Sequence, residues 1–409
     1  MNSRPPPIPL PAGVGAIPLL FCIEMHTYGM PTYLVISGYP ALTGTLLSQK
    51  ATAQRDHDDI RRRILHEPRG HADAFGAILR PHTEHTLTKK AHMGVLYVHG
   101  HGYSTMCGHA TIAAARFLVD CWDEDIFPRR REVVFHRESE SVMLVLHTPG
   151  GLVEVVVPTV PGEEGRRVDV GRQIGFVALA AWAISTALVV DIPSGRRWGE
   201  LECLGRDGVS VSLAFCGTFI LEVKIEELGF SSDLFDAPVD FARLKEVTSQ
   251  LKEIINTDPA YREYLRFPDR EGYGAVFGAM VTDKTHGKAR EGTKGAELGV
   301  YFFGGNHIDR SPTGSAAAAR AALDAARGNL KAGDSWTYHS LPTHAFGLEG
   351  MVATVLEDGT GGRDRPGVFG PVKVQIEGKA FYTGYSTILQ EDGDILGEKG
   401  FLLDELSGK

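Results

Sequence analysis

Two stretches of this sequence share one pattern, from which the architecture is predicted: CGHATIAAARFLVD at residues 107–120 and TGSAAAARAALDAARG at residues 313–328. Each follows an apolar, strand-like segment and a glycine-containing turn, and each continues as an alanine-rich helix. This repetition predicts two halves of one architecture. In both halves a small thiol or hydroxyl residue followed by glycine stands at the helix N-terminus, where unpaired backbone N–H groups and the helix dipole favour an anion such as a carboxylate.

The composition is that of a globular protein and excludes several classes of function. The 409 residues are 43% hydrophobic and 23% charged, and 42 Lys and Arg against 51 Asp and Glu give a formal net charge of −9. This length suggests two or three compact units, and the acidic balance argues against a nucleic-acid partner. Five cysteines without CxxC spacing suggest neither a disulfide framework nor a cysteine zinc site, so a cytoplasmic location is expected.

The sequence predicts an α+β fold in which strands predominate. Segments rich in β-branched residues predict strands at 32–37, 94–98, 132–135, 142–147, 153–157, 209–214 and 219–223. Helical patterns occur at 56–65, 108–119, 241–255 and 314–326. Polar runs at 160–172, 284–297 and 357–365 predict surface loops.

Two further segments bear on location. Residues 1–18 are proline-rich and lack the apolar run of a secretory signal, so we expect a disordered leader there. Residues 174–190 carry no charge, but these 17 residues are at the lower limit for a membrane span. A buried helix or strand is the preferred interpretation, and no membrane partner is expected.

Cys107 is the candidate catalytic residue of the first half. A helix N-terminus lowers the pKa of a thiol below its usual value of about 8.5, so this side chain can act as a thiolate near neutral pH. The alternative is an inert buried cysteine, because free cysteine is among the most buried residue types. Gly108 and His109 at the helix start favour the functional interpretation.

The second half offers a polar turn, GGNHIDRSPTGS at residues 304–315. Ser311 or Thr313 could be the N-cap of the following helix, and capping would equally explain Ser315. A buried Asp309 beside an anion-binding helix end would instead suit an ammonium or iminium group. The residue pattern leaves these alternatives open.

Motifs for a bound cofactor are missing from the sequence. Neither GxxxxGK[ST] nor GxGxxG after a strand occurs, so a nucleotide is not expected. His99 and His101 alternate on one predicted strand and could join Cys107 or His109 as metal ligands, but HxH alone is common. We therefore expect neither a metal nor another cofactor.

These residues resemble the proline racemase superfamily. The signature segments are MCGHATI at 106–112 and DRSPTG at 309–314, the second of which ordinarily reads DRSPCG. Further likeness lies at 25–31, 67–71, 148–153 and 400–401, so that the resemblance covers about residues 19–403, with insertions near 160–190 and 284–297. Met30 and Cys216 depart from the usual residues at their positions.

The resemblance implies two similar lobes of the diaminopimelate-epimerase-like fold, each with mixed strands around a central helix and with the active site between them. We expect residues 19–200, joined by about 375–409, to form the first lobe, and residues 201–374 to form the second. The family's racemases use two cysteines on opposite faces of the substrate α-carbon, without metal or cofactor. A homodimer would be in keeping with the family.

Thr313 stands where a racemase has its second cysteine. A threonine hydroxyl is too weak an acid to be a populated base. The Cys107 and Thr313 pair resembles the branch that dehydrates trans-3-hydroxy-L-proline to 1-pyrroline-2-carboxylate, so a cofactor-independent hydro-lyase acting on an imino acid is the expected activity. A proline racemase, a 4-hydroxyproline epimerase and a non-catalytic imino-acid-binding protein are the alternatives.

The resemblance also implies a role for each site residue. Cys107 would abstract the α-proton, and Asp309 would accept hydrogen bonds from the secondary ammonium, with assistance from His109. Either Thr313 or protonated Cys107 would deliver a proton to the leaving hydroxyl. Backbone N–H groups would hold the substrate carboxylate, and these belong to Gly108, His109, Gly314 and Ser315.

Overall fold

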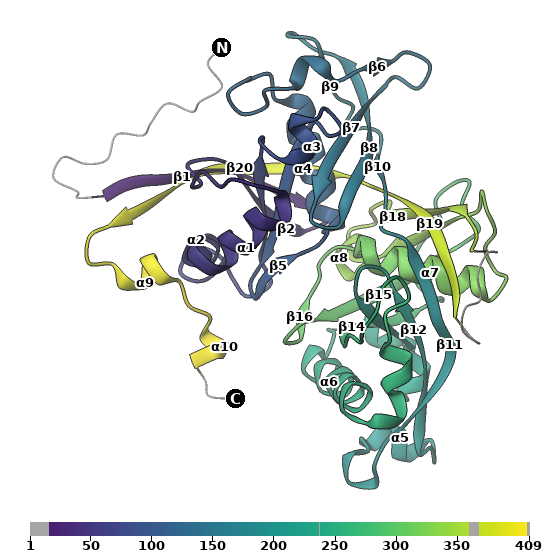
Figure 1. Cartoon of the computed structure of the whole chain (residues 1–409). Helices are drawn as coiled ribbons and strands as arrows, with labels where there is room; N and C mark the ends of the chain where they lie inside the picture. Colours follow the sequence, from purple (N-terminus) through teal and green to yellow (C-terminus); the bar gives the residue numbers. More distant parts are fainter. Residues whose placement is uncertain (1–15, 237, 360–367, 407–409) are drawn as a thin grey trace. The chain divides into compact units, whose positions relative to one another are not determined.

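The chain divides into two compact units, each a set of strands around one central helix (Figure 1). The computed structural model describes residues 16–236, 238–359 and 368–406. The first unit is Met1–Phe176 with Gly378–Lys409, and the second is Val177–Glu377. Both helices and strands are present and strands predominate, which confirms the expected fold class.

The strands of the first unit are hydrogen-bonded in the order β20–β1–β2–β3–β4–β7–β8–β10. The bounds of these strands are β1 (Ala16–Thr27), β2 (Met30–Ser37), β3 (Phe75–Arg80), β4 (Met93–His99), β7 (Ser141–Thr148), β8 (Gly151–Pro161), β10 (Ile174–Val177) and β20 (Ala380–Glu391). Short strands pair beside them at β5 (Gly102–Ser104), β6 (Phe135–His136) and β9 (Arg166–Val168). The helices are α1 (Leu46–Asp56), α2 (Asp58–Leu65), α3 (Glu84–Leu87), α4 (Gly108–Asp120), α9 (Ile395–Lys399) and α10 (Leu403–Leu406).

Helix α4 is the centre of this unit and packs against β1, β2, β3, β8 and β20. Its residues from Gly108 to Ala115 are all buried. Alanine side chains are small enough for strands to approach the helix closely on several sides, and this explains why a helix without a polar face is stable here.

The second unit repeats this arrangement around α7 (Gly314–Ala326), which packs against β11, β12, β13 and β18. Its strands run β11–β12–β13–β14–β15–β17–β18–β19 and return to β11, which closes the sheet around the helix. The strand bounds are β11 (Ala181–Asp191), β12 (Gly208–Phe215), β13 (Phe219–Lys224), β14 (Val276–Asp283), β15 (Ala296–Phe303), β16 (His307–Ile308), β17 (Ser335–His339), β18 (Met351–Glu357) and β19 (Phe369–Gly378). The other helices are α5 (Gly199–Cys203), α6 (Phe241–Thr257) and α8 (Leu341–Ala345).

The two units share one order of strand pairing. Along β1–β2–β3–β4–β7–β8 the pairs alternate antiparallel, parallel, antiparallel, parallel, antiparallel, and the same alternation runs along β12–β13–β14–β15–β17–β18. Helix α4 follows β4 and β5, just as α7 follows β15 and β16. The prediction of two similar halves is therefore confirmed.

Several local predictions need correction. The strand expected at 132–135 begins three residues too early: only Phe135 is strand, as the first residue of β6. Arg130–Glu132 form a single 3-10 turn instead, because the buried Arg130 guanidinium donates to the Val119 carbonyl (2.9 Å) and holds the chain there. The loop expected at 160–172 contains the end of β8 and all of β9, whose backbone groups pair with each other. Residues 174–190 form parts of β10 and β11.

The remaining expectations concern the ends of the chain and the membrane. Residues 1–15 of the expected leader and residues 360–365 of the expected loop lie outside the described residues. Residues 16–18 belong to β1 and not to a leader, because their backbone pairs with β20. In the described part of the chain no helix is both long and apolar enough to cross a bilayer.

Candidate active site

Cys107 occupies the N-cap position of α4. Its backbone is extended (φ −143°, ψ 112°), and its carbonyl accepts the first helical hydrogen bond, from the N–H of Thr111 (2.9 Å). The side chain makes no capping hydrogen bond and is only 8% exposed. The thiol thus lies at the positive end of the helix without neutralising it, which is where a thiolate is most favoured.

The neighbours of Cys107 fix the first turn of α4. The Sγ atom lies 3.4 Å from Nδ1 of the buried His109, whose ring packs edge-on against Phe75 (4.7 Å between centroids). Thr27 in β1 donates to the His109 carbonyl (2.9 Å). The Thr111 hydroxyl donates to the Cys107 carbonyl (2.8 Å), so both strand and helix contacts hold the thiol and the imidazole side by side.

The Asp309 carboxylate organises the turn before α7. Its Oδ1 accepts from the N–H and the hydroxyl of Ser311, both at 2.8 Å, and its Oδ2 accepts from the Thr313 hydroxyl at 2.8 Å. Asp309, Ser311 and Thr313 are all buried. A carboxylate has about four lone-pair sites, so Asp309 retains capacity for one more donor.

Thr313 is the N-cap of α7, but its side chain does not cap the helix. Its hydroxyl is instead a donor to Asp309, and its backbone has φ 63°, a left-handed conformation that β-branched residues rarely adopt. Such a conformation costs about 1–3 kcal/mol and persists only where the surroundings impose it. Simple capping by Thr313 is therefore wrong, and the turn presents the first amides of α7 without a side-chain cap from this residue.

A buried ion pair supports this strained turn from inside the unit. Arg320 donates to Glu297 Oε1 (2.8 Å) and to the Pro312 carbonyl (3.4 Å), and its guanidinium stacks over Tyr338. Both charged side chains are almost fully buried, at 1% and 0% exposure. Burial raises the pKa of Glu297 to about 7, and Arg320 opposes that rise.

Replacing Arg320 by Met is expected to destabilise the protein by about 3–5 kcal/mol at about pH 8. The buried Glu297 carboxylate then keeps only the longer ion pair with Lys284, 3.9 Å from its Oε2. The loss should be smaller at about pH 5, where Glu297 takes up a proton. Urea unfolding at both pH values measures it. The Glu297→Gln/Arg320→Met variant should recover much of the stability, and equal instability of the single and double variants would contradict this explanation.

The predicted site residues form two groups, one in each unit. The first group lies at the start of α4 and consists of Cys107, Gly108 and His109. The second group lies at or just before the start of α7 and consists of Asp309, Thr313, Gly314 and Ser315. The sequence pattern indicates only a possible N-cap role for Ser311, whereas in the structure its hydroxyl links Asp309 to the N–H of Thr313 (3.2 Å). The spacing of Asp309, Ser311 and Thr313 at alternate positions was the available signal.

Two groups of side chains that could hold a metal ion lie outside the predicted site residues. Within the described residues these are Glu84, His85 and His147 in the first unit, and Asp236, His286 and His344 in the second. Neither group includes the ligands considered from sequence, which are His99, His101, Cys107 and His109.

Known proteins resemble this chain along nearly its full length. The family model described as proline racemase matches residues 22–402. A relative from Pongo abelii named trans-L-3-hydroxyproline dehydratase is 33% identical over 402 residues, covering 96% of this chain and 97% of the relative. The human protein named trans-3-hydroxy-L-proline dehydratase is also 33% identical, with the same coverage. A proline racemase from Clostridioides difficile is 26% identical and covers 93% of this chain and 97% of its own.

Solved structures share the fold. A hydroxyproline epimerase from Agrobacterium vitis, with bound trans-4-hydroxy-L-proline, superposes with a TM-score of 0.71 at 20% identity, covering 96% of both chains. A probable proline racemase from Agrobacterium radiobacter K84 gives a TM-score of 0.69, also at 20% identity, and covers 95% of this chain and 98% of its own. A matching family model over almost the whole chain, together with relatives above 30% identity, establishes that this protein belongs to the proline racemase family.

Proposed function

We propose that this protein is a hydro-lyase that dehydrates trans-3-hydroxy-L-proline to 1-pyrroline-2-carboxylate with Cys107 as its base. The observation that carries the proposal is the hydrogen bond from the Thr313 hydroxyl to the buried Asp309 carboxylate. A hydroxyl that donates to an anion is held in its protonated form, so this position supplies no second base for racemisation. Relatives that are named for the same dehydration and cover nearly the whole chain support it.

In this proposal the residues that start α4 and those that start α7 have the roles that the family resemblance implies. The substrate carboxylate accepts hydrogen bonds from the first amides of α4 and α7, which belong to Gly108, His109, Gly314 and Ser315. The hydrogen bonds from these N–H groups strengthen as the α-proton leaves, because negative charge then spreads onto the carboxylate. The remaining lone-pair site of Asp309 accepts from the secondary ammonium and fixes the ring.

The proposed reaction needs only one residue for both proton transfers. In the trans isomer the 3-hydroxyl and the carboxylate lie on opposite ring faces, so the Cα–H and C3–O bonds lie on the same face. The Cys107 thiolate removes the α-proton on that face and is then a thiol beside the leaving hydroxyl. Returning the proton there breaks the C3–O bond, releases water and forms a Cα=C3 enamine, which tautomerises to the cyclic imine.

His109 supports the thiolate in this mechanism. Its Nδ1 lies 3.4 Å from Sγ, within reach of a hydrogen bond involving sulfur. A donor at that nitrogen stabilises the charged form of the thiol. The edge-on contact with Phe75 and the buried position keep the ring in place.

A substrate panel tests the activity. Purified protein without added metal or cofactor is incubated with trans-3-hydroxy-L-proline, trans-4-hydroxy-L-proline and L-proline, and imine formation and optical rotation are followed separately. We expect imine from the 3-hydroxy substrate alone. A change of rotation without imine would instead identify an epimerase or racemase, and saturable binding with neither change would identify a non-catalytic binding protein.

We further propose that the protein works as a homodimer in the cytoplasm. The five cysteines, including the exposed Cys203, form no disulfide among the described residues, which suits a reducing compartment. Light scattering coupled to gel filtration tests the dimer: a mass of one chain would contradict it.

A further inference from the structure

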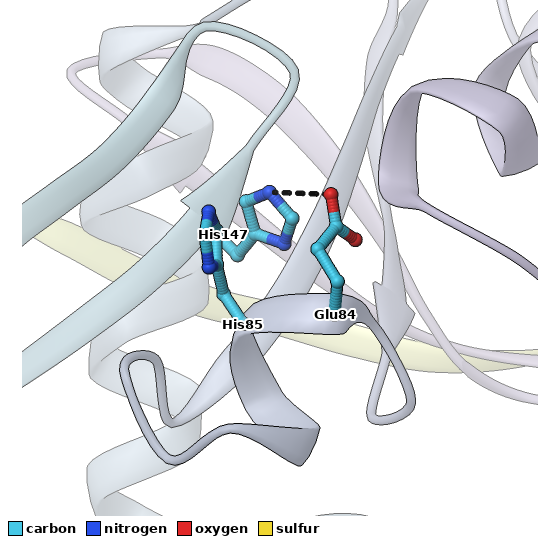
Figure 2. Close-up of side chains that lie close together, drawn as sticks. All are labelled: Glu84, His85 and His147. Atoms are coloured by element: carbon cyan, nitrogen blue, oxygen red, sulfur yellow. Dashed lines mark ion pairs between the residues drawn. The ribbon is translucent and has the colours of Figure 1, made fainter.

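Glu84, His85 and His147 lie together in the first unit although more than sixty positions separate the first two from the third (Figure 2). Glu84 and His85 begin the short helix α3, and His147 lies near the end of β7. The parallel pairing of β7 with β4 sets His147 beside Gly94, which brings it to α3. One ligand atom from each side chain lies within 4.8 Å of the other two.

The His147 ring is oriented with one nitrogen toward the other two side chains. Its Nδ1 lies 2.9 Å from the Thr83 hydroxyl, and its Nε2 lies 3.8 Å from Glu84 Oε1, which is too long for a hydrogen bond. The side chain is only 7% exposed. A histidine that donates from Nδ1 to an outer hydroxyl presents its Nε2 lone pair, which is the usual arrangement of a metal ligand.

The Glu84 carboxylate is anchored through one oxygen and leaves the other available. Oε2 accepts from the N–H of Leu46 (2.8 Å), whereas Oε1 faces His147. At 37% exposure the side chain is open to solvent on one side. This carboxylate can therefore accept an ion and a bound water without losing its structural hydrogen bond.

The third side chain, His85, stands edge-on to His147 with 4.4 Å between ring centroids. One nitrogen of each ring lies within 4.8 Å of the same Glu84 oxygen, so the two imidazoles and the carboxylate face a common point.

We propose that Glu84, His85 and His147 form a binding site for a divalent transition-metal ion of the zinc type, with water in the remaining position. Two imidazoles and one carboxylate are a ligand set that zinc accepts. Ligands about 2.0–2.1 Å from a tetrahedral ion are about 3.4 Å apart. The 3.8 Å between His147 Nε2 and Glu84 Oε1 closes to that value with a small side-chain rotation. The site is independent of the proposed dehydration, which routes no step through a metal.

The second group of possible ligands is less suited to an ion. Both nitrogens of His286 already lie at hydrogen-bond distance from carboxylates, 2.8 Å from Asp283 and 3.1 Å from Asp236. These carboxylates raise the pKa of His286 against the opposing effect of burial. A ring whose two nitrogens both face carboxylates already has its hydrogen-bonding partners without a metal, so this group serves as a comparison site.

Zinc titration of the full-length protein, freed of any affinity tag, tests the proposal by calorimetry. We expect one saturable zinc ion per chain. His85→Gln/His147→Gln should abolish binding, and Glu84→Gln should weaken it more than about tenfold while still accepting from Leu46. Cobalt(II) titration provides a second readout, because ligand-field absorption reports the ion's protein ligands directly.

Two control variants locate the ion. His286→Gln/His344→Gln removes the comparison site and Cys107→Ser removes the thiol beside His109, and both should retain binding. Thermal unfolding without metal should be unchanged in Glu84→Gln, which shows that any loss of binding is not a loss of fold. The proposal is overturned if no saturable binding occurs, if binding survives in His85→Gln/His147→Gln, or if either control variant loses it.

Discussion

Turnover by a Cys107→Ser variant is expected to fall by at least about 10²–10⁴-fold, because a serine hydroxyl is not ionised near neutral pH and cannot replace the thiolate base. The change is close to isosteric, and the Cys107 backbone that starts α4 is unaffected. Binding should therefore persist. Imine formation gives the rate, and the thermal shift produced by pyrrole-2-carboxylate, a planar substrate analogue, gives binding.

The other thiols supply the controls. Cys203→Ser should leave turnover unchanged, since this thiol is exposed and lies in α5 of the second unit. Iodoacetamide should alkylate both Cys107 and Cys203, and pyrrole-2-carboxylate should protect Cys107 alone. Substantial turnover by Cys107→Ser, or labelling of Cys107 that the analogue does not slow, would contradict its assignment as the base.

Thr313→Cys is expected to convert the site toward racemase chemistry, because it restores a second ionisable group at the start of α7. Solvent deuterium should then enter the α-position of proline from both faces, giving deuterated D-proline from L-proline. The exchange should quicken as pH rises, since the neighbouring Asp309 carboxylate disfavours a second negative charge on the new thiol. Mass spectrometry with chiral separation measures it.

Two further variants, Thr313→Ser and Thr313→Val, distinguish the effect of the hydroxyl group from the effect of the side-chain shape. Serine still donates to Asp309, so dehydration should continue. Valine leaves Asp309 Oδ2 without its donor, which should cost about 1–3 kcal/mol of stability and impair turnover. No deuterium in D-proline from Thr313→Cys, in a variant that binds the planar analogue, would mean that the pocket differs from a racemase in more than this residue.

The local sequence pattern is sufficient to predict α4 and α7, the two helices at whose starts the proposed site residues lie. The helix expected at 314–326 is α7 residue for residue, and the one expected at 108–119 differs from α4 by one position. Alanine-rich composition and a preceding glycine turn are signals that do not depend on distant contacts. The strand predicted from residue 132 starts only at Phe135, because Arg130 binds a carbonyl from α4, a contact that no local propensity contains.

The roles of individual side chains depended on tertiary packing. Sequence placed Thr313 at a helix start, but only the fold imposes φ 63° there and directs its hydroxyl to Asp309. The Glu84, His85 and His147 group was absent from the sequence interpretation, because its members become neighbours only when β7 pairs with β4.

Short-range patterns of residue type are thus sufficient to predict the two-half architecture, the helix starts and the family. Which polar atoms meet depends on contacts between residues that are distant in the chain. Hydrogen-bond partners of buried groups such as Asp309 and His147 are set by strand pairing and close packing, since a buried polar atom must find a partner among whatever the fold brings within about 3 Å.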